Sequence, residues 1–135
     1  MAIKLVNLES LMPDDAARLA ALEIRDSDEL LRRACEREAR RRLAQSSGVS
    51  EPELLRLARI GDFARIVGVL EAHVLLLEAL AIVSMAELRG QDPTHLVKAL
   101  RRKNVELTLV RSVPPESTIA RWIADAKALP DVLEC

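Results

Sequence analysis

The longest apolar stretch of the chain, residues 66–86, constrains the fold most. It reads IVGVLEAHVLLLEALAIVSMA and is about as long as a membrane-spanning helix, which needs roughly 20 residues with few or no charges. The stretch contains Glu71, His73 and Glu78, however. We therefore expect residues 71–80 to form a buried helix at the centre of a domain, and we expect no association with a membrane.

The composition around this stretch favours helices. Half of the 135 residues are hydrophobic, with one Trp, one Phe and no Tyr, and only four are glycine. A chain of this length is typical of one domain. Because residues that favour helix interiors are abundant and turn residues are sparse, the sequence predicts a compact all-α single domain of about seven to eight short helices.

Capping residues and prolines mark where these helices begin. Capping residues followed by Glu three positions later, and prolines in the first turn, predict helix starts near residues 13, 27, 51, 85, 93 and 114. The second of these helices is expected to run over 27–45, and Gly61-Asp62 is expected to end the third. Residues 104–113 are the only strand-like stretch and are expected to be an extended loop. The predicted organisation is a first half over 1–48, a second over 49–104, a loop and last helix over 105–130, and a frayed tail over 131–135.

Residues 61–88 follow the order of a helix-hairpin-helix unit. Ile66 precedes Gly68 and Val69, apolar helix residues follow, and the stretch from Ser84 to Leu88 gives a capped second helix. A weaker copy starts at residues 8–13 and continues to residue 30. With further matching stretches near 40–50 and 109–130, the chain resembles the bacterial domain of unknown function 4332 family, a tandem helix-hairpin-helix-like domain, over nearly its whole length. The resemblance implies a fold, and the family has no established activity from which a function could be inferred.

The hairpins depart from the pattern that binds nucleic acid. Glycines in such hairpins let backbone N–H groups approach a phosphate. In the second unit Gly68 remains, but Leu70 replaces the second glycine and Glu71 replaces the proline; in the first, Ser10 and Met12 stand at both glycine positions. An acid in the first turn repels phosphate. We therefore expect two degenerate hairpins that keep their folding role and have lost much of their phosphate-binding chemistry.

Two basic groups are the candidate contact sites for a partner or for nucleic acid. Residues 32–42 contain six Arg and two Glu, and the net charge of the whole chain is −1. The candidates, with Gly68 added, are Arg33, Arg37, Arg40, Arg41, Lys98, Arg101, Arg102 and Lys103. The first four are expected to project from one side of a helix. The alternative interpretation is a solvated face with local ion pairs. Leu76, Leu77 and Trp122 are expected to be structural.

The remaining polar residues predict no catalytic or metal site. The two histidines are far apart, and the cysteines lack metal-ligand spacing. Cys35 is expected to face the core and Cys135 to lie in an exposed tail. We therefore expect no cofactor, no metal, no catalytic residue and a cytoplasmic location.

The first hypothesis for the function is a non-catalytic interaction or adaptor module that binds a protein partner or a second copy of itself. The alternative is sequence-independent binding of double-stranded nucleic acid through the Arg-rich helix faces and the Gly68 hairpin.

Overall fold

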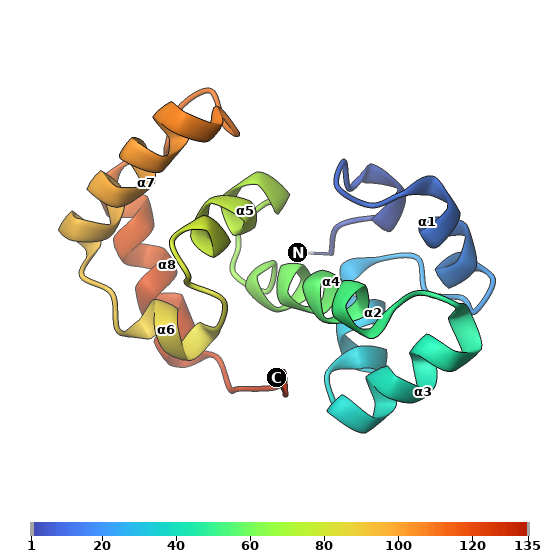
Figure 1. Ribbon diagram of the computed structural model, residues 1–135. Coiled ribbons are helices and arrows are strands. Elements are labelled where there is room, and N and C mark those ends of the chain that lie inside the picture. The colour runs from blue at the N-terminus through green and yellow to red at the C-terminus, as the bar shows by residue number, and fades with distance from the viewer. Residues whose placement is uncertain (1, 135) are drawn as a thin grey trace. The chain divides into compact units, whose positions relative to one another are not determined.

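The computed structural model describes residues 2–134, which form an all-α structure (Figure 1). The all-α prediction is confirmed, and eight α-helices fall within the described residues. They are preceded by one short 3-10 helix. The elements are η1 (Leu5–Asn7), α1 (Pro13–Ala20), α2 (Ser27–Ala34), α3 (Arg37–Ser47), α4 (Glu51–Phe63), α5 (Glu71–Ala79), α6 (Met85–Arg89), α7 (Pro93–Leu107) and α8 (Glu116–Ala128).

The described residues fall into two compact units. The first holds residues 2–65 together with 132–134, and the second holds residues 66–131. The division therefore follows α4. Cys135, which was expected to lie in an exposed tail, is outside the described residues.

In the first unit, α2 packs against α4, and α3 packs against both. Gly61 lies inside α4, so the prediction that Gly61-Asp62 ends this helix is wrong. A Cβ atom on Gly61 would lie 2.7 Å from the carbonyl oxygen of Ser27, at the start of α2. The glycine therefore permits a close approach of two helices and does not interrupt its own.

The predicted helix over 27–45 is two helices, separated at Cys35 and Glu36. No glycine or proline marks the break, and Glu36 has an extended backbone with φ −93° and ψ 140°. Contacts from distant residues replace the lost helical hydrogen bonds. The backbone N–H of Glu134 donates to the Cys35 carbonyl at 2.7 Å, and the Glu134 carboxylate accepts from the Arg37 N–H, at the start of α3, at 3.0 Å. Residues 132–134 are thus held by the first unit, and Cys35 is half-buried at a helix end instead of facing the core.

In the second unit, α8 packs against α6 and α7, and α5 packs against α7. Leu76, Leu77 and Trp122 are almost completely buried there. α5 ends at Ala79, one residue before the end of the predicted stretch 71–80. α7 continues to Leu107, so the extended loop predicted from residue 104 begins later. Asn104 closes this helix: its side chain accepts from the N–H groups of Leu109 and Val110 at 2.9 and 3.1 Å.

Candidate interaction surfaces

The structure separates the four arginines that were predicted to share one helix face. Arg33 lies on α2, whereas Arg37, Arg40 and Arg41 lie on α3. Arg40 is only 4 % exposed, and its guanidinium donates to the carbonyls of Ala34 and Cys35 at 2.9 and 3.1 Å. The prediction that Arg40 projects from the surface is therefore wrong. It caps the C-terminal end of α2, where carbonyls lack helical partners and a positive charge is stabilising.

Two exposed arginines, one on α2 and one on α3, form ion pairs within their own helices. Arg41 contacts both carboxylate oxygens of Glu38, at 3.2 and 3.1 Å from Nε, and Arg32 pairs with Glu29. The hydrogen bond from Arg41 lowers the pKa of Glu38. Exposed pairs of this kind contribute little to stability, and these two pairs balance the charges of two of the six arginines in residues 32–42.

A polar hollow of about 250 Å³ lies beside these pairs. Arg33 on α2 and Arg42 on α3 line it, together with Ala39, Leu43 and Ser46. Within the described residues, neither arginine forms an ion pair or a side-chain hydrogen bond. Arg42 and Ser46 were not predicted as site residues, because the two helices that build the hollow were predicted to be one.

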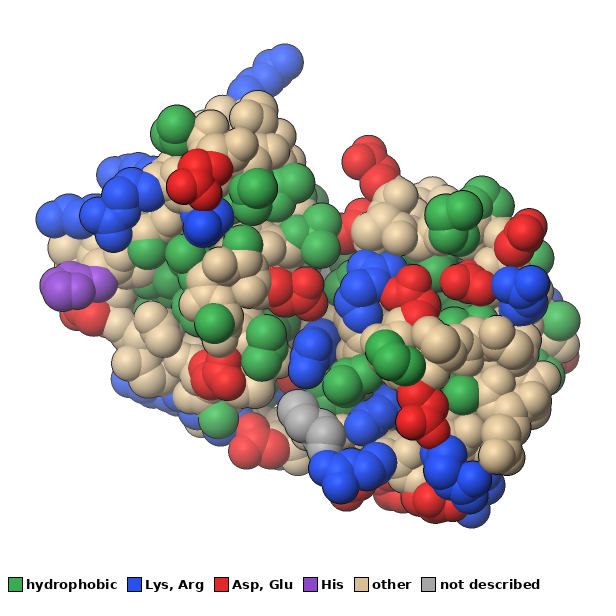
Figure 2. Space-filling model, viewed as in Figure 1, with side chains coloured by type: hydrophobic (Ala, Val, Ile, Leu, Met, Phe, Trp, Pro, Cys, Tyr) green, Lys and Arg blue, Asp and Glu red, His purple; other side chains and the backbone are tan. Residues whose placement is uncertain are grey.

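The second basic group lies on α7. Figure 2 shows Lys and Arg side chains gathered over this helix. Lys98, Arg101 and Arg102 are exposed and form no ion pair within the described part of the chain, whereas Lys103 is half-buried and pairs with Glu106 at 3.1 Å. Positions 98, 101 and 102 are spaced by three and four residues and thus share one side of the helix.

The Gly68 hairpin opens the second unit and is held from α8. Gly68 has φ +91°, a conformation that favours glycine. Arg121 donates to the carbonyl of Val67 at 3.0 Å. Val67 and Leu70 are 59 % and 56 % exposed, so the hairpin presents apolar side chains on either side of the glycine.

His73 closes this hairpin from inside α5. Its Nδ1 accepts a hydrogen bond from the Leu70 N–H at 3.1 Å. Its ring packs against Trp122, with the ring centroids 5.0 Å apart. Burial lowers the pKa of His73, which favours the neutral ring that this hydrogen bond requires. His73 therefore acts as a capping and packing residue. Within residues 2–134, no group of three or more His, Cys, Asp or Glu side chains is placed to hold a metal ion.

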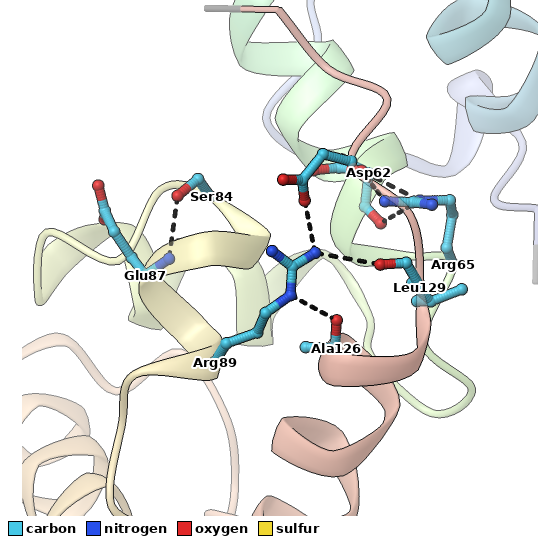
Figure 3. A network of polar contacts seen from close by, with 8 residues as sticks. Asp62, Arg65, Ser84, Glu87, Arg89, Ala126 and Leu129 are labelled. Carbon is cyan, nitrogen blue, oxygen red and sulfur yellow. Dashed lines mark hydrogen bonds and ion pairs between the residues drawn. The ribbon is translucent and has the colours of Figure 1, made fainter.

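Arg89 organises the end of α8, as Figure 3 shows. Its guanidinium donates to the carbonyls of Ala126 and Leu129 at 2.7 and 3.1 Å, and it also pairs with Asp131. Like Arg40, this arginine comes from another helix and caps C-terminal carbonyls. It is half-buried and belongs to the structural arginines of the chain.

The first unit carries an apolar groove along η1 and α1. Two adjoining hollows of about 370 and 240 Å³ share the lining residues Leu5, Val6, Ala16 and Ala20. Val6 is 76 % exposed, and Met12, at the N-terminal end of α1, is 65 % exposed. Figure 2 shows hydrophobic side chains at the surface over α1. No role for this region was predicted from the sequence, because the groove forms only when η1 is placed beside α1.

These elements define an all-helical protein with two compact units joined after α4. A family model, the domain of unknown function DUF4332, matches residues 9–129. The chain belongs to this family, and the resemblance found in the sequence is confirmed. The helix-hairpin-helix description of its two halves stays a prediction. Comparisons with curated proteins and with solved structures give no match. Among the described helices, none has both the length and the apolar character required to cross a bilayer.

Proposed function

We propose that the chain is a non-catalytic protein-interaction module that binds an apolar segment of a partner along the groove of η1 and α1. The observation that carries this proposal is the exposure of Val6 and Met12, 76 % and 65 %, beside two adjoining apolar hollows. Contiguous exposed apolar surface commonly marks a protein-binding site. Burying these side chains against a partner is favourable because it removes apolar surface from water.

The small side chains of α1 favour a helical partner. Ala17 is exposed and Ala20 is half-buried at the wall of the groove. Small residues at such positions let a second helix approach closely, and an amphipathic helix in a groove is a common mode of peptide recognition. Lys4, Arg25 and Asp26 line one end of the groove. The Asp26 carboxylate accepts from the backbone N–H of Glu29, so the two exposed cations favour an acidic residue at the corresponding end of the partner.

Site-specific photocrosslinking in native lysate tests this proposal. A photoreactive residue at Ala17 should crosslink to a defined protein, with or without nuclease, and the same residue at the exposed Gln45 of α3 should not. Val6→Asp should remove the crosslink without changing the helical content. Crosslinking at Ala17 that matches the pattern at Gln45, or that disappears with nuclease, would contradict the proposal. A crosslink between two copies of the chain would identify the partner as the protein itself.

A second candidate function is sequence-independent binding of double-stranded nucleic acid by α7. It is favoured by the three unpaired basic side chains Lys98, Arg101 and Arg102 and by the left-handed geometry of Gly68 in its hairpin. The second unit as a whole has eight Lys and Arg residues against eight Asp and Glu residues, so its formal net charge is zero. This balance makes nucleic acid the second choice, because non-specific binding depends on phosphate neutralisation.

A salt titration with duplex DNA tests the second candidate. Three phosphate contacts predict that the logarithm of the binding constant falls with the logarithm of salt concentration with a slope of about −3. Replacing the three basic residues by glutamine should abolish binding. The absence of any binding at low salt would exclude this function.

A further inference from the structure

The hollow between α2 and α3 is lined by two arginines that form no ion pair or side-chain hydrogen bond within the described residues. Its lining includes Arg33 and Arg42, each of which carries a guanidinium group, and Ser46, which carries a hydroxyl. Among the described residues, no carboxylate lines it, and its volume is about 250 Å³. The hollow shares no described lining residue with the groove of η1 and α1, so the two sites do not overlap.

Three neighbouring arginines on α2 and α3 have interaction partners on or next to these helices. Arg32 and Arg41 each pair with a glutamate three residues earlier, and Arg40 is buried on two carbonyls. Arg33 and Arg42 lie among them without such partners in the described part of the chain. Arg42 does lower the pKa of Glu38 through its charge, but the hydrogen bond from Arg41 is the larger cause, and Glu38 is already engaged by Arg41.

The third polar group of the hollow, the hydroxyl of Ser46, forms only long hydrogen bonds. The Ser46 hydroxyl donates to the carbonyls of Arg42 and Leu43 at 3.2 and 3.3 Å, which is longer than a typical O–H···O hydrogen bond of about 2.7–2.8 Å. Reorienting this hydroxyl toward a ligand therefore gives up only weak contacts. Because Ser46 lies one helical turn after Arg42, the hydroxyl and that guanidinium lie on the same side of α3.

We propose that Arg33, Arg42 and Ser46 form a binding site for a phosphate monoester dianion. Two guanidinium groups without a lining carboxylate match a ligand of charge −2, and planar guanidinium groups donate paired hydrogen bonds to phosphate oxygens. The hydroxyl adds a third donor. The two arginines come from different helices, so the site exists only because the chain bends at Cys35 and Glu36.

Titrations at constant ionic strength test the site, with backbone and arginine Nε–H resonances as the readout. Inorganic phosphate should shift the resonances of Arg33, Arg42 and Ser46 saturably at a pH of about 7.5, where the dianion dominates. Arg33→Gln and Arg42→Gln should each weaken binding about tenfold, as expected for the loss of one charged hydrogen bond. The matched control is Arg32→Gln, which removes a neighbouring exposed arginine outside the hollow and should change binding less than about twofold.

The pH dependence separates recognition of a dianion from general attraction to the basic surface. A phosphate monoester has a second pKa near 6, so binding of O-phosphoserine should weaken as pH falls from about 7.5 to about 5.5. Sulfate, which stays a dianion in this range, should show no such loss. Free O-phosphoserine and a phosphoserine peptide distinguish a small phosphorylated compound from a phosphorylated protein, and tighter binding of either one than of inorganic phosphate supports the site.

Three results would overturn the proposal. They are no saturable shift with any phosphate compound, equal losses in Arg32→Gln and Arg33→Gln, or phosphoserine binding that does not depend on pH. Circular dichroism of each variant verifies folding. Arg33 is exposed on α2, so Arg33→Gln keeps the test valid even if Arg42→Gln disturbs α3.

Discussion

Replacing Arg40 by alanine is expected to destabilise the protein much more than replacing its neighbour Arg41. The two residues are consecutive in α3 and were predicted to have the same role. Arg40 is 4 % exposed and donates two hydrogen bonds to the end of α2, whereas Arg41 is exposed and its side-chain hydrogen bonds go to Glu38. The pair therefore tests the assignment of the buried arginine directly.

The expected cost of Arg40→Ala follows from three contributions. The Ala34 carbonyl, whose contact with Arg40 is buried, loses this partner at a cost of about 1–3 kcal/mol. The Cys35 carbonyl keeps the Glu134 N–H at 2.7 Å, so its loss is smaller. Removing the buried methylenes of Arg40 costs about 0.8 kcal/mol each. Relief of the buried charge offsets part of this sum, and we expect a net loss of about 3 kcal/mol.

Denaturant unfolding followed by circular dichroism measures this loss. Arg40→Met retains most of the apolar volume, so it isolates the loss of the hydrogen bonds and should cost about 2 kcal/mol. Arg41→Ala should leave the unfolding midpoint unchanged. If Arg40→Ala costs under about 1 kcal/mol, or if Arg41→Ala costs as much as Arg40→Ala, the assignment of Arg40 as the cap of α2 is wrong.

Three further changes test other contacts by the same unfolding measurement. Gly61→Ala should cost about 2 kcal/mol because its Cβ meets a backbone carbonyl, whereas Gly90→Ala, whose Cβ would meet its neighbours at ordinary van der Waals distances, should stay within about 0.5 kcal/mol of the parent; equal effects would contradict the close helix approach. Glu134→Ala should cost about 1 kcal/mol through the lost acceptor for the Arg37 N–H, and Glu134→Gln should restore it; failure of this restoration would exclude the cap. Burial lowers the pKa of His73, so protonation favours the unfolded chain, and stability should fall as pH drops below the unfolded value of about 6.5. His73→Gln should flatten this part of the pH profile; an unchanged slope would refute the role.

Local signals predicted most helix starts but not the helix break that matters most. Ser50 and Ser84 accept from the N–H groups of Glu53 and Glu87, as capping boxes require. These contacts span three residues and can be read from the sequence. The break after α2 depends on Glu134, which is 97 positions from Arg37. No local pattern carries that information, so the sequence predicted one continuous helix.

The candidate surfaces were predictable only in part, for a related reason. Arg33, Lys98, Arg101 and Arg102 are exposed, as expected of basic helix residues. The burial of Arg40 could not be predicted, because it depends on how α2 ends. For the same reason the partnership of Arg33 with Arg42 was missed: a single helix would place positions nine apart on different faces. A two-helix corner instead brings both to one hollow.

Because glycine is scarce in this chain, some of its arginines satisfy the carbonyls at helix ends in place of a glycine. These structural arginines have to be set aside before a binding role is assigned to the others. A glycine in the left-handed conformation commonly ends a helix, and Gly48 does so for α3 with φ +80°. The ends of α2 and α8 have no such glycine within the described residues. Arg40 and Arg89 from other helices satisfy their carbonyls instead. A chain with four glycines and many arginines therefore uses part of its positive charge as helix caps. Arg33 and Arg42 donate no hydrogen bond to a helix end within the described residues, and they remain the two arginines of this corner to which the proposed phosphate site assigns a ligand.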